Sequence, residues 1–298
     1  MRLVKRQIPM RKKILIVGAN GMLGSSLLRY FSSIGDYEVL GTTRSMVVAK
    51  QLEQKHNVKI IDNVDVIDFK RLETVVVEHK PNIVFNCVGI IKQLDAAKNN
   101  ILSIEINSLL PHKLAQLCSA HSAKLIHFST DCIFKGTKGN YVEDDESDAI
   151  DLYGKSKFLG EVEYNGHLTL RTSIIGHELG SNHSLVDWFL SQKKSVKGFT
   201  NAIFSGLPTC YMAEVIHKYV LPNNLAGLFH LSVEPISKYD LLNIIKIVYG
   251  VSTDIEPTNE FKIDRSLNST LFRNKTNFVP ESWDKLIEKM KDEYNKYF

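Results

Sequence analysis

The 298-residue sequence predicts an α/β fold built on a doubly wound parallel sheet. Two observations carry this prediction. Short, continuous apolar runs alternate with stretches of helical periodicity, which is the pattern of βαβ units. The first apolar run also passes directly into a glycine-rich turn and then into the first helical stretch. A chain of this length can bury a sizeable core, and its 44% of hydrophobic residues is ordinary for a globular protein.

Six strands are expected up to Gly176, with helices between them. The first is a continuous apolar run that ends in glycine, which is typical of a strand covered on both faces. Pro81 ends the helix before the fourth strand. The expected strands are 13–18, 37–43, 58–62, 82–89, 124–129 and 168–175, and the expected helices are 22–31, 69–79, 104–120 and 152–163.

The alternation stops after Gly176. No linker rich in proline, glycine or serine follows it, so the later segments are expected to pack on the sheet and form a pocket at its carboxyl edge. Helices are expected at 185–192, 212–221, 238–249 and 283–294, a strand at 228–231, an irregular stretch at 199–209 and a polar, loop-rich stretch at 253–275.

The basic excess comes from one end of the chain. The formal net charge is +4, but the first thirteen residues hold six Lys or Arg and no acid, so the remainder carries −2. This distribution argues against a broad nucleic-acid surface. Residues 1–12 are expected to be a disordered basic leader, with a nucleic-acid or membrane tether as the alternative. No apolar run approaches the ~18–20 residues of a membrane helix.

The four cysteines lack CxxC spacing, and three of them fall in expected apolar elements. Buried free thiols suit a reducing compartment, and the leader lacks the apolar stretch of a secretory signal. We therefore expect a cytoplasmic protein. No spacing of the HExxH kind is present, so no metal site is expected.

The glycine-rich turn reads Gly18-Ala-Asn-Gly21-Met-Leu-Gly24. Gly18 and Gly21 would let the backbone approach a pyrophosphate, and Gly24 would let the helix pack close to the strand. The helix N-terminus would offer N–H groups and its positive dipole end to the phosphates. The motif therefore predicts a Rossmann-type dinucleotide-binding domain. The expected division is the leader at 1–12, this domain at 13–176 and a smaller substrate-binding portion at 177–298, with segments at about 225–250 returning to the sheet.

The end of the second expected strand indicates which cofactor is bound. In NAD-binding domains an acid about 20 residues after the motif usually holds the ribose 2′-hydroxyl. Here Thr42-Thr43-Arg44 occupies that place, and Arg44 could pair with a 2′-phosphate through its planar guanidinium. We therefore expect NADP(H), with NAD as the alternative.

A second constellation combines the end of the fifth strand with the helix that follows. Thr130 ends that strand, and Tyr153 and Lys157 stand four residues apart, on one helix face. A nearby ammonium lowers the pKa of a phenol, which is normally near ~10. Tyr153 could then act as a general acid or base closer to neutrality, with Thr130 bonded to the same substrate oxygen.

These motifs resemble the extended short-chain dehydrogenase/reductase superfamily and, within it, the dTDP-4-dehydrorhamnose reductase family of nucleotide-sugar reductases. The resemblance runs from about Lys13 to Ile245 and is most specific from Phe128 to Glu161. It implies that NADPH delivers hydride to the C4 keto carbon of a nucleotide-linked 6-deoxy-4-ketohexose, in deoxysugar and surface-polysaccharide biosynthesis. Tyr153 would protonate the C4 oxygen, Lys157 would lower the pKa of that phenol and hold the nicotinamide ribose, and Thr130 would polarise the carbonyl. A homodimer is also implied.

The resemblance also assigns the cofactor residues. The segment at 65–66 would line the adenine, and the segment at 86–89 would run beside the cofactor. The full set is Gly18, Asn20, Gly21, Met22, Leu23, Gly24, Arg44, Asp65, Val66, Asn86, Cys87, Val88, Gly89, Tyr153 and Lys157.

The sequence departs from the family pattern where the sugar pocket is expected. Cys132 replaces a frequent tyrosine, and 148–151 lacks the proline that commonly precedes the YxxxK segment. Asn107 matches a helix asparagine near the active site, and Arg265 could clamp a diphosphate. Lys92 could meet a substrate phosphate or be a plain surface lysine. The substrate candidates are Lys92, Asn107, Asp131, Cys132, Thr172, Phe199, Asn201, Ser205 and Arg265.

Two alternative functions remain. One is a nucleotide-sugar epimerase or dehydratase of the same superfamily. Arg44 disfavours an epimerase, because epimerases usually carry an acid after the second strand. The Asp131-Cys132 pair disfavours a dehydratase, because dehydratases usually carry Thr-Asp-Glu there. The other is a non-catalytic, NADP-binding regulatory subunit, which the retained Thr130, Tyr153 and Lys157 disfavour.

Overall fold

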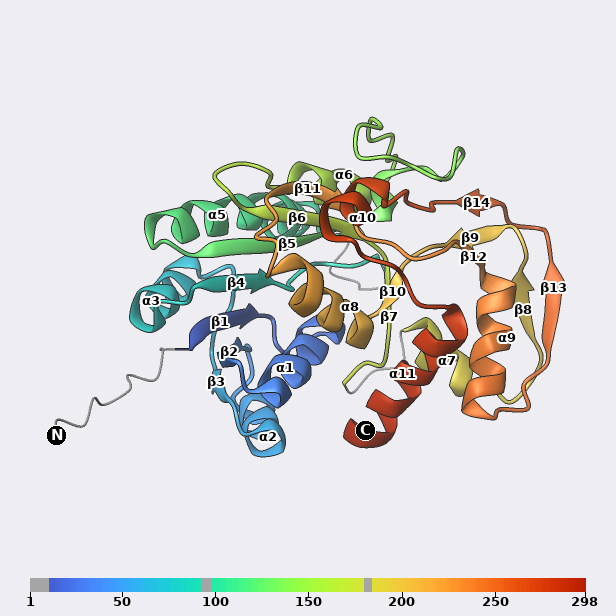
Figure 1. The fold of residues 1–298 in the computed structure, drawn as a ribbon, viewed down its shortest axis with the longest axis horizontal. Helices are drawn as coiled ribbons and strands as arrows, with labels where there is room; N and C mark the ends of the chain where they lie inside the picture. Colours follow the sequence, from blue (N-terminus) through green and yellow to red (C-terminus); the bar gives the residue numbers. More distant parts are fainter. Residues whose placement is uncertain (1–10, 93–97, 180–183) are drawn as a thin grey trace, which may run out of the picture.

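A computed structural model describes residues 11–92, 98–179 and 184–298 (Figure 1). Most of the expected leader lies outside these residues, and Lys12 already begins the first strand. The central element is a parallel sheet of seven strands in the order β11-β6-β5-β4-β1-β2-β3, which confirms the predicted fold class. The strands are β1 (Lys12–Val17), β2 (Tyr37–Thr42), β3 (Lys59–Ile61), β4 (Ile83–Asn86), β5 (Lys124–Thr130), β6 (Leu168–Thr172) and β11 (Gly227–His230).

Helices cover both faces of the sheet. Alternate residues of each strand point to opposite faces, so Ile14 and Ile16 join one core while Leu15 and Val17 join the other. The first core is closed by α1 (Met22–Ile34), α2 (Met46–His56), α8 (Thr209–Val215) with its π-helical extension η4 (Ile216–Val220), and α11 (Trp283–Tyr297). The second is closed by α3 (Phe69–His79) and α5 (Leu110–Ala120).

The helical region expected at 104–120 is longer and less regular than predicted. It consists of α4 (Asn100–Ile104), the π-helical turn η2 (Glu105–Leu109) and α5. The next helix, α6 (Leu152–Leu159), ends before the expected Glu163, because the chain turns at Gly160. A carbon atom added at Gly160 would overlap the carbonyl of Asn107, so this turn packs directly on η2.

The second half of the chain contains more strands than predicted. The expected strand at 168–175 is interrupted at Ser173, and its end forms β7 (Ile174–Ile175), which pairs with β10 (Leu207–Pro208). The stretch expected to be irregular holds β9 (Ala202–Phe204), which pairs with β12 (Ile236–Ser237) and β14 (Ile263–Asp264). The remaining elements are η3 (Asp131–Ile133), α7 (Leu185–Leu190), β8 (Val196–Phe199), α9 (Lys238–Tyr249), β13 (Ile255–Thr258), paired with β8, and α10 (Thr270–Thr276).

A smaller lobe beside the carboxyl edge of the sheet is formed by β8, β9, β12, β13, β14, α7 and α9 (Figure 1). The strand β11 returns to the main sheet beside β6, and α10 packs against it. The C-terminal helix α11 closes against α1 through a nearly buried ion pair, Arg29 Nε to Glu293 Oε1 at 3.0 Å. Ser26 donates a hydrogen bond to the same carboxylate oxygen, and the Phe298 ring lies 5.2 Å from the guanidinium.

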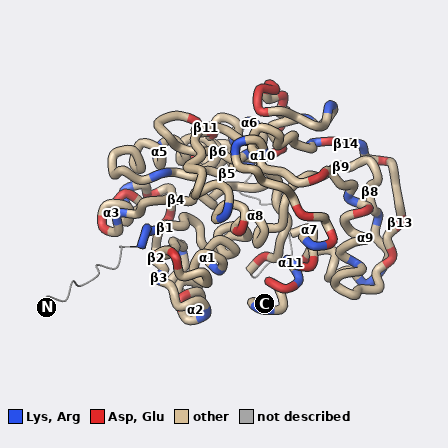
Figure 2. Tube along the Cα trace, in the orientation of Figure 1, with Lys and Arg blue, Asp and Glu red and all other residues tan. Residues whose placement is uncertain are grey.

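Charged side chains of both signs are interspersed along the described chain (Figure 2). Among the described helices, none has the length and apolar character needed to span a bilayer.

Candidate active site

The glycine turn after β1 is shaped for a phosphate. Gly18 has a positive φ of 83°, a conformation that residues with side chains rarely adopt. A carbon atom added at Gly24 would overlap the carbonyl oxygen of Gly18, so the first turn of α1 sits directly on the loop. Gly21 caps α1 with no side-chain acceptor, which leaves first-turn N–H groups available for an anion. Asn20, Met22 and Leu23 complete the turn.

The end of β2 is tied to this turn. Gly18 N donates to Thr42 Oγ1 at 3.2 Å, and Ala19 N donates to the Thr42 carbonyl at 2.9 Å. Arg44 follows two residues later and is exposed, immediately before Ser45, the residue that caps α2. A guanidinium there is free to meet the 2′-phosphate of a nucleotide laid along the turn.

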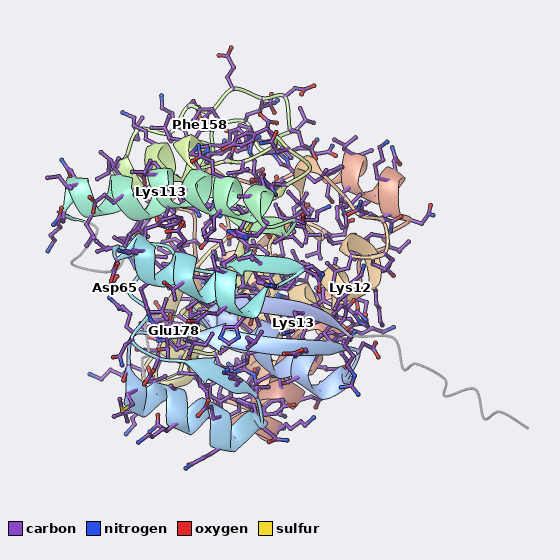
Figure 3. The ribbon with its side chains drawn as sticks, turned by 90° about the vertical axis from the view of Figure 1, so that its left-hand side faces the viewer. Lys12, Lys13, Asp65, Lys113, Phe158 and Glu178 are labelled. Carbon is purple, nitrogen blue, oxygen red and sulfur yellow. The ribbon has the colours of Figure 1, made fainter. Side chains whose placement is uncertain are left out.

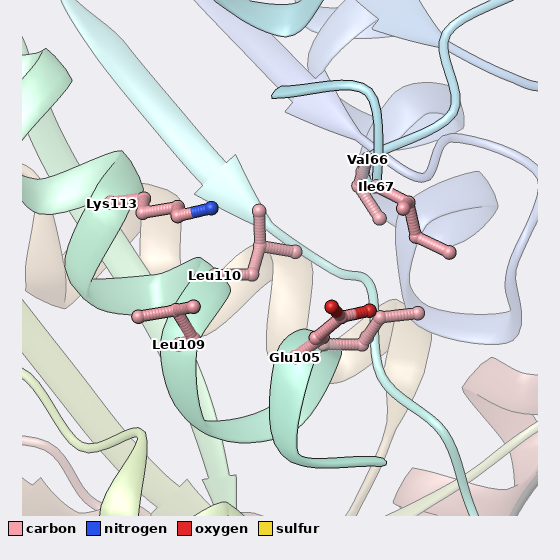
Figure 4. A pocket seen from close by; sticks show the side chains of 7 residues that line it. Val66, Ile67, Glu105, Leu109, Leu110 and Lys113 are labelled. Atoms are coloured by element: carbon pink, nitrogen blue, oxygen red, sulfur yellow. The ribbon is translucent and has the colours of Figure 1, made fainter. Parts of the chain in front are cut away.

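A small hollow of about 40 Å³ lies farther along the same edge (Figure 4). Val66, from the loop after β3, faces η2 and α5 across it, whereas Asp65 is exposed and accepts a hydrogen bond from Ile67 N at 3.1 Å. The lining residues are Val66, Ile67, Glu105, Ile106, Leu109, Leu110 and Lys113. The lining combines five apolar side chains with the charged Glu105 and Lys113.

The segment after β4 passes close to the glycine turn. A carbon atom added at Gly18 would crowd Val88, and Gly89 is exposed beside it. Asn107 holds the continuation of this segment: its Oδ1 accepts from Ile90 N at 2.9 Å, and its Nδ2 donates to Ile90 O and to Ser156 Oγ. Asn107 is thus a buried clamp between the β4 loop and α6.

Thr130 and Tyr153 meet because α6 packs against the end of β5. A carbon atom added at Gly154 would overlap the carbonyl of Cys132, so α6 approaches η3 at backbone contact. Asp151 caps α6, accepting from Gly154 N at 2.8 Å. The Thr130 hydroxyl lies beside the Tyr153 phenol, near enough to lower the pKa of that phenol. This hydroxyl also lies 3.1 Å from an Asp131 carboxylate oxygen.

The Tyr153 phenol has a raised pKa. Burial is the main cause, and the neighbouring Cys132, Asp131 and Asp151 raise the pKa further, whereas the adjacent Thr130 hydroxyl lowers it. Lys157, the group expected to lower this pKa, points instead to Phe128 O at 2.6 Å and to His127 Nε2 at 3.4 Å. Its effect on the phenol therefore stays a prediction for the cofactor-loaded protein.

A cavity of about 400 Å³ opens from Asp131 and Cys132 into the smaller lobe. Phe199 and Arg265, both predicted for the substrate side, line it as well. Arg265 is fixed by donating from Nε to Phe134 O at 2.7 Å, and its Nη1 lies 3.7 Å from Cys132 Sγ.

Other predicted substrate residues lie outside this described lining. Thr172 is buried with its hydroxyl bonded to Ser173 O, and Ser205 Oγ accepts from Leu267 N. Asn201 is exposed, and its carbonyl accepts from Ile263 N in the β9–β14 pair. Lys92 pairs with Asp151 at 2.6 Å, and its ammonium lies 5.6 Å from the centre of the Tyr153 ring.

Most of the residues that line this cavity were not predicted from the sequence. Lys238 is the most consequential omission, because its ammonium stands 4.5 Å from the centre of the Phe204 ring and acts on the buried Asp131 together with Arg265. Nothing in its local sequence indicates this position. The missed lining residues are Ser173, Leu185, Trp188, Lys197, Ala202, Ile203, Phe204, Lys238, Leu242, Phe261 and Ile263.

The described residues contain no group of three or more His, Cys, Asp or Glu placed to hold a metal ion. All four cysteines are free thiols. Burial raises the pKa of Cys118 to about 12 and that of Cys132 to about 11, so neither is an activated nucleophile.

A glycine turn that fits a dinucleotide, with Thr130, Tyr153 and Lys157 beside it at the same sheet edge, defines a protein of the short-chain dehydrogenase/reductase class. The match to a family model is more specific. The model described as the RmlD substrate binding domain matches residues 11–296, so the chain belongs to that family.

Named relatives agree with this assignment. The chain is 24% identical to a dTDP-4-dehydrorhamnose reductase from Aggregatibacter actinomycetemcomitans, over 94% of this chain and 98% of that one. It is 28% identical to a probable low-salt glycan biosynthesis reductase from Haloferax volcanii, over 84% and 85%. A crystal structure of dTDP-4-dehydrorhamnose reductase from Bacillus anthracis in complex with NADP has a TM-score of 0.80 at 22% identity, covering 95% of this chain and 100% of that one.

Proposed function

We propose that this protein is an NADPH-dependent reductase of the 4-keto group of a nucleotide-linked 6-deoxy-4-ketohexose, acting in deoxysugar and polysaccharide biosynthesis. The observation that carries the proposal is the position of Thr130 and Tyr153. The Thr130 hydroxyl lies beside the Tyr153 phenol, and Thr130 directly precedes Asp131 and Cys132, which line the 400 Å³ cavity. The names of the family and of its reductase relatives support the same activity.

The residues present fit NADPH. The uncapped first turn of α1 would hold the diphosphate, Arg44 the 2′-phosphate, Val66 the adenine and Lys157 the nicotinamide ribose. Asp65 and the segment at 86–89 would border the bound molecule. When bound, NADPH supplies a hydride to the carbonyl carbon of the substrate.

The protein's own groups handle the carbonyl oxygen. The Thr130 hydroxyl rotates from Asp131 and donates a hydrogen bond to the carbonyl oxygen. This bond stabilises the negative charge that develops on that oxygen. Tyr153, whose raised pKa keeps it a protonated phenol, donates its proton to the oxygen as general acid. Lys92, above the phenol ring, and Lys157 would both favour the phenolate that remains.

The cavity supports a substrate with a diphosphate. Arg265 and Lys238 place two cations in its wall, and Arg forks suit phosphate oxygens. Asp131 lies between them and Thr130, where its carboxylate can accept hydrogen bonds from sugar hydroxyls. The aromatic rings of Phe199 and Phe261, 5.7 Å apart, offer a surface for the base.

The test is turnover with a panel of dTDP-, UDP-, GDP- and CDP-4-keto-6-deoxy sugars, followed as oxidation of NADPH. The proposal expects oxidation with at least one of them. Tight NADPH binding without turnover on any sugar would favour a regulatory subunit. Interconversion of a sugar without net NADPH consumption would favour an epimerase.

We also propose that the protein is a homodimer and acts in the cytoplasm. The helical segments α4, η2 and α6 contact one another, and each exposes large apolar side chains. Phe158 of α6 lies on the same face of the molecule as Lys113 of α5 (Figure 3). These side chains are Ile101, Ile104, Leu109, Phe158 and Leu159. Light scattering of the native protein and of Leu159→Glu tests this: a dimer that the substitution dissociates supports it, and a native monomer contradicts it.

A further inference from the structure

A buried chain of polar side chains lies behind Lys157, and the reduction step does not use it. Asn86 and His127 are register partners on the adjacent strands β4 and β5. Asn86 Nδ2 lies 3.1 Å from His127 Nδ1, and His127 Nε2 lies 3.4 Å from Lys157 Nζ. The exposed fractions of Asn86, His127 and Lys157 are 1%, 0% and 5%.

The hydrogen bonds fix the tautomer of the imidazole. Val88 N donates to Asn86 Oδ1 at 3.2 Å, which sets the amide orientation and turns Nδ2 toward His127. Because Nδ2 is a donor, His127 Nδ1 must accept. Burial holds the pKa of His127 well below its usual range, so the ring is neutral and carries its single proton on Nε2. That proton points at Lys157.

The His127 N–H donor that points at Lys157 Nζ favours the neutral amine of this lysine over its ammonium. An ammonium has only donors, whereas an amine has one lone pair that can accept from His127 while an N–H still donates to Phe128 O at 2.6 Å. Burial lowers the pKa of Lys157 to about 8, with Glu161 and Cys87 opposing. The titratable groups on the elements around Lys157 are Cys87, Glu105, Lys124, His127, Asp131, Cys132, Tyr153, Lys155 and Glu161, and His112 of α5 acts on His127.

We propose that His127 is a positioning residue, which favours the neutral amine of Lys157 over its ammonium by donating a hydrogen bond to Nζ. The place of Lys157 beside the cofactor rests on the proposed function, but its titration does not. Replacing His127 by phenylalanine removes the donor, stabilises the ammonium relative to the amine, and therefore raises the midpoint.

The experiment follows the titration of Lys157 in the cofactor-free protein by NMR of ¹³C-labelled lysine side chains, with the resonance identified by its loss in Lys157→Arg. The expected midpoint is near 8 in the native protein. In His127→Phe it should rise by about one pH unit, the size of one hydrogen bond to the neutral form. An unchanged or lower midpoint overturns the proposal.

His167→Gln is the matched control, because His167 is also buried but bonds Ser119 and Ala115 O away from this chain. It should leave the Lys157 midpoint in place. A second measurement needs no substitution at His127: ¹⁵N shifts of the native imidazole should show the proton on Nε2, and a proton on Nδ1 refutes the proposal. If the sugar panel gives no turnover, the proposed function fails while both titration results still decide this inference.

Discussion

Arg44 provides the sharpest prediction about cofactor choice. It is exposed at the end of β2, two residues beyond the Thr42 that is bonded to the glycine turn. A charge-assisted hydrogen bond contributes ~1.5–3 kcal/mol, and solvent screening at an exposed site favours the lower part of that range. Since 1.4 kcal/mol corresponds to tenfold, Arg44→Ala should weaken NADPH binding by roughly 10- to 100-fold.

The assay is a fluorescence titration of NADPH and NADH against the purified protein. NADH lacks the 2′-phosphate, so its Kd should change by less than about twofold in Arg44→Ala. Lys50→Ala, which removes an exposed cation from the neighbouring helix α2, is the control and should leave both affinities unchanged. An equal loss of NADPH and NADH affinity in Arg44→Ala, or no loss of either, would refute the reasoning.

Two further predictions concern stability and the phosphate turn. Glu293→Ala leaves Arg29 buried without its carboxylate, which should cost ~3–5 kcal/mol and lower Tm by on the order of 10 °C. Calorimetry measures the Tm of this variant. The control is Glu288→Ala, on the exposed side of the same helix, which should change Tm little. Equal Tm values for the two variants would contradict the account. Gly24→Ala places a methyl group into the Gly18 carbonyl, so NADPH affinity should fall by at least roughly tenfold while the chain still folds. Unchanged affinity with native circular dichroism would show that α1 need not approach the turn so closely.

Local sequence signals were sufficient to predict the strands of the parallel sheet. Continuous apolar runs mark the buried strands, and α3 spans Phe69–His79 as predicted from its apolar face. The helix α2 was missed because only Ala49 and Leu52 of its eleven residues are buried, which leaves a weak apolar face. The strands of the smaller lobe were missed because they are two to four residues long and their partners are distant, as when Ile255 pairs with Val196.

Some residues of the candidate site have a local sequence signal, and others have none. Thr130, Tyr153 and the glycine motif belong to short segments whose spacing carries the signal. Lys238 has no such signal, because its place depends on α9 packing beside β9 so that its ammonium lies over Phe204. The orientation of Lys157 toward His127 likewise depends on the packing of α6 against β5, which helical spacing alone does not reveal.

The most direct test of the central claim compares the native protein with Tyr153→Phe, using NADPH and the best 4-keto sugar of the panel. The account predicts a fall in kcat of about 10²–10⁴-fold, because only the proton donor is removed. The Kd for NADPH should stay within about twofold, because the ring and the phosphate turn remain. A Tyr153→Phe variant that turns over the sugar at the native rate would contradict the account.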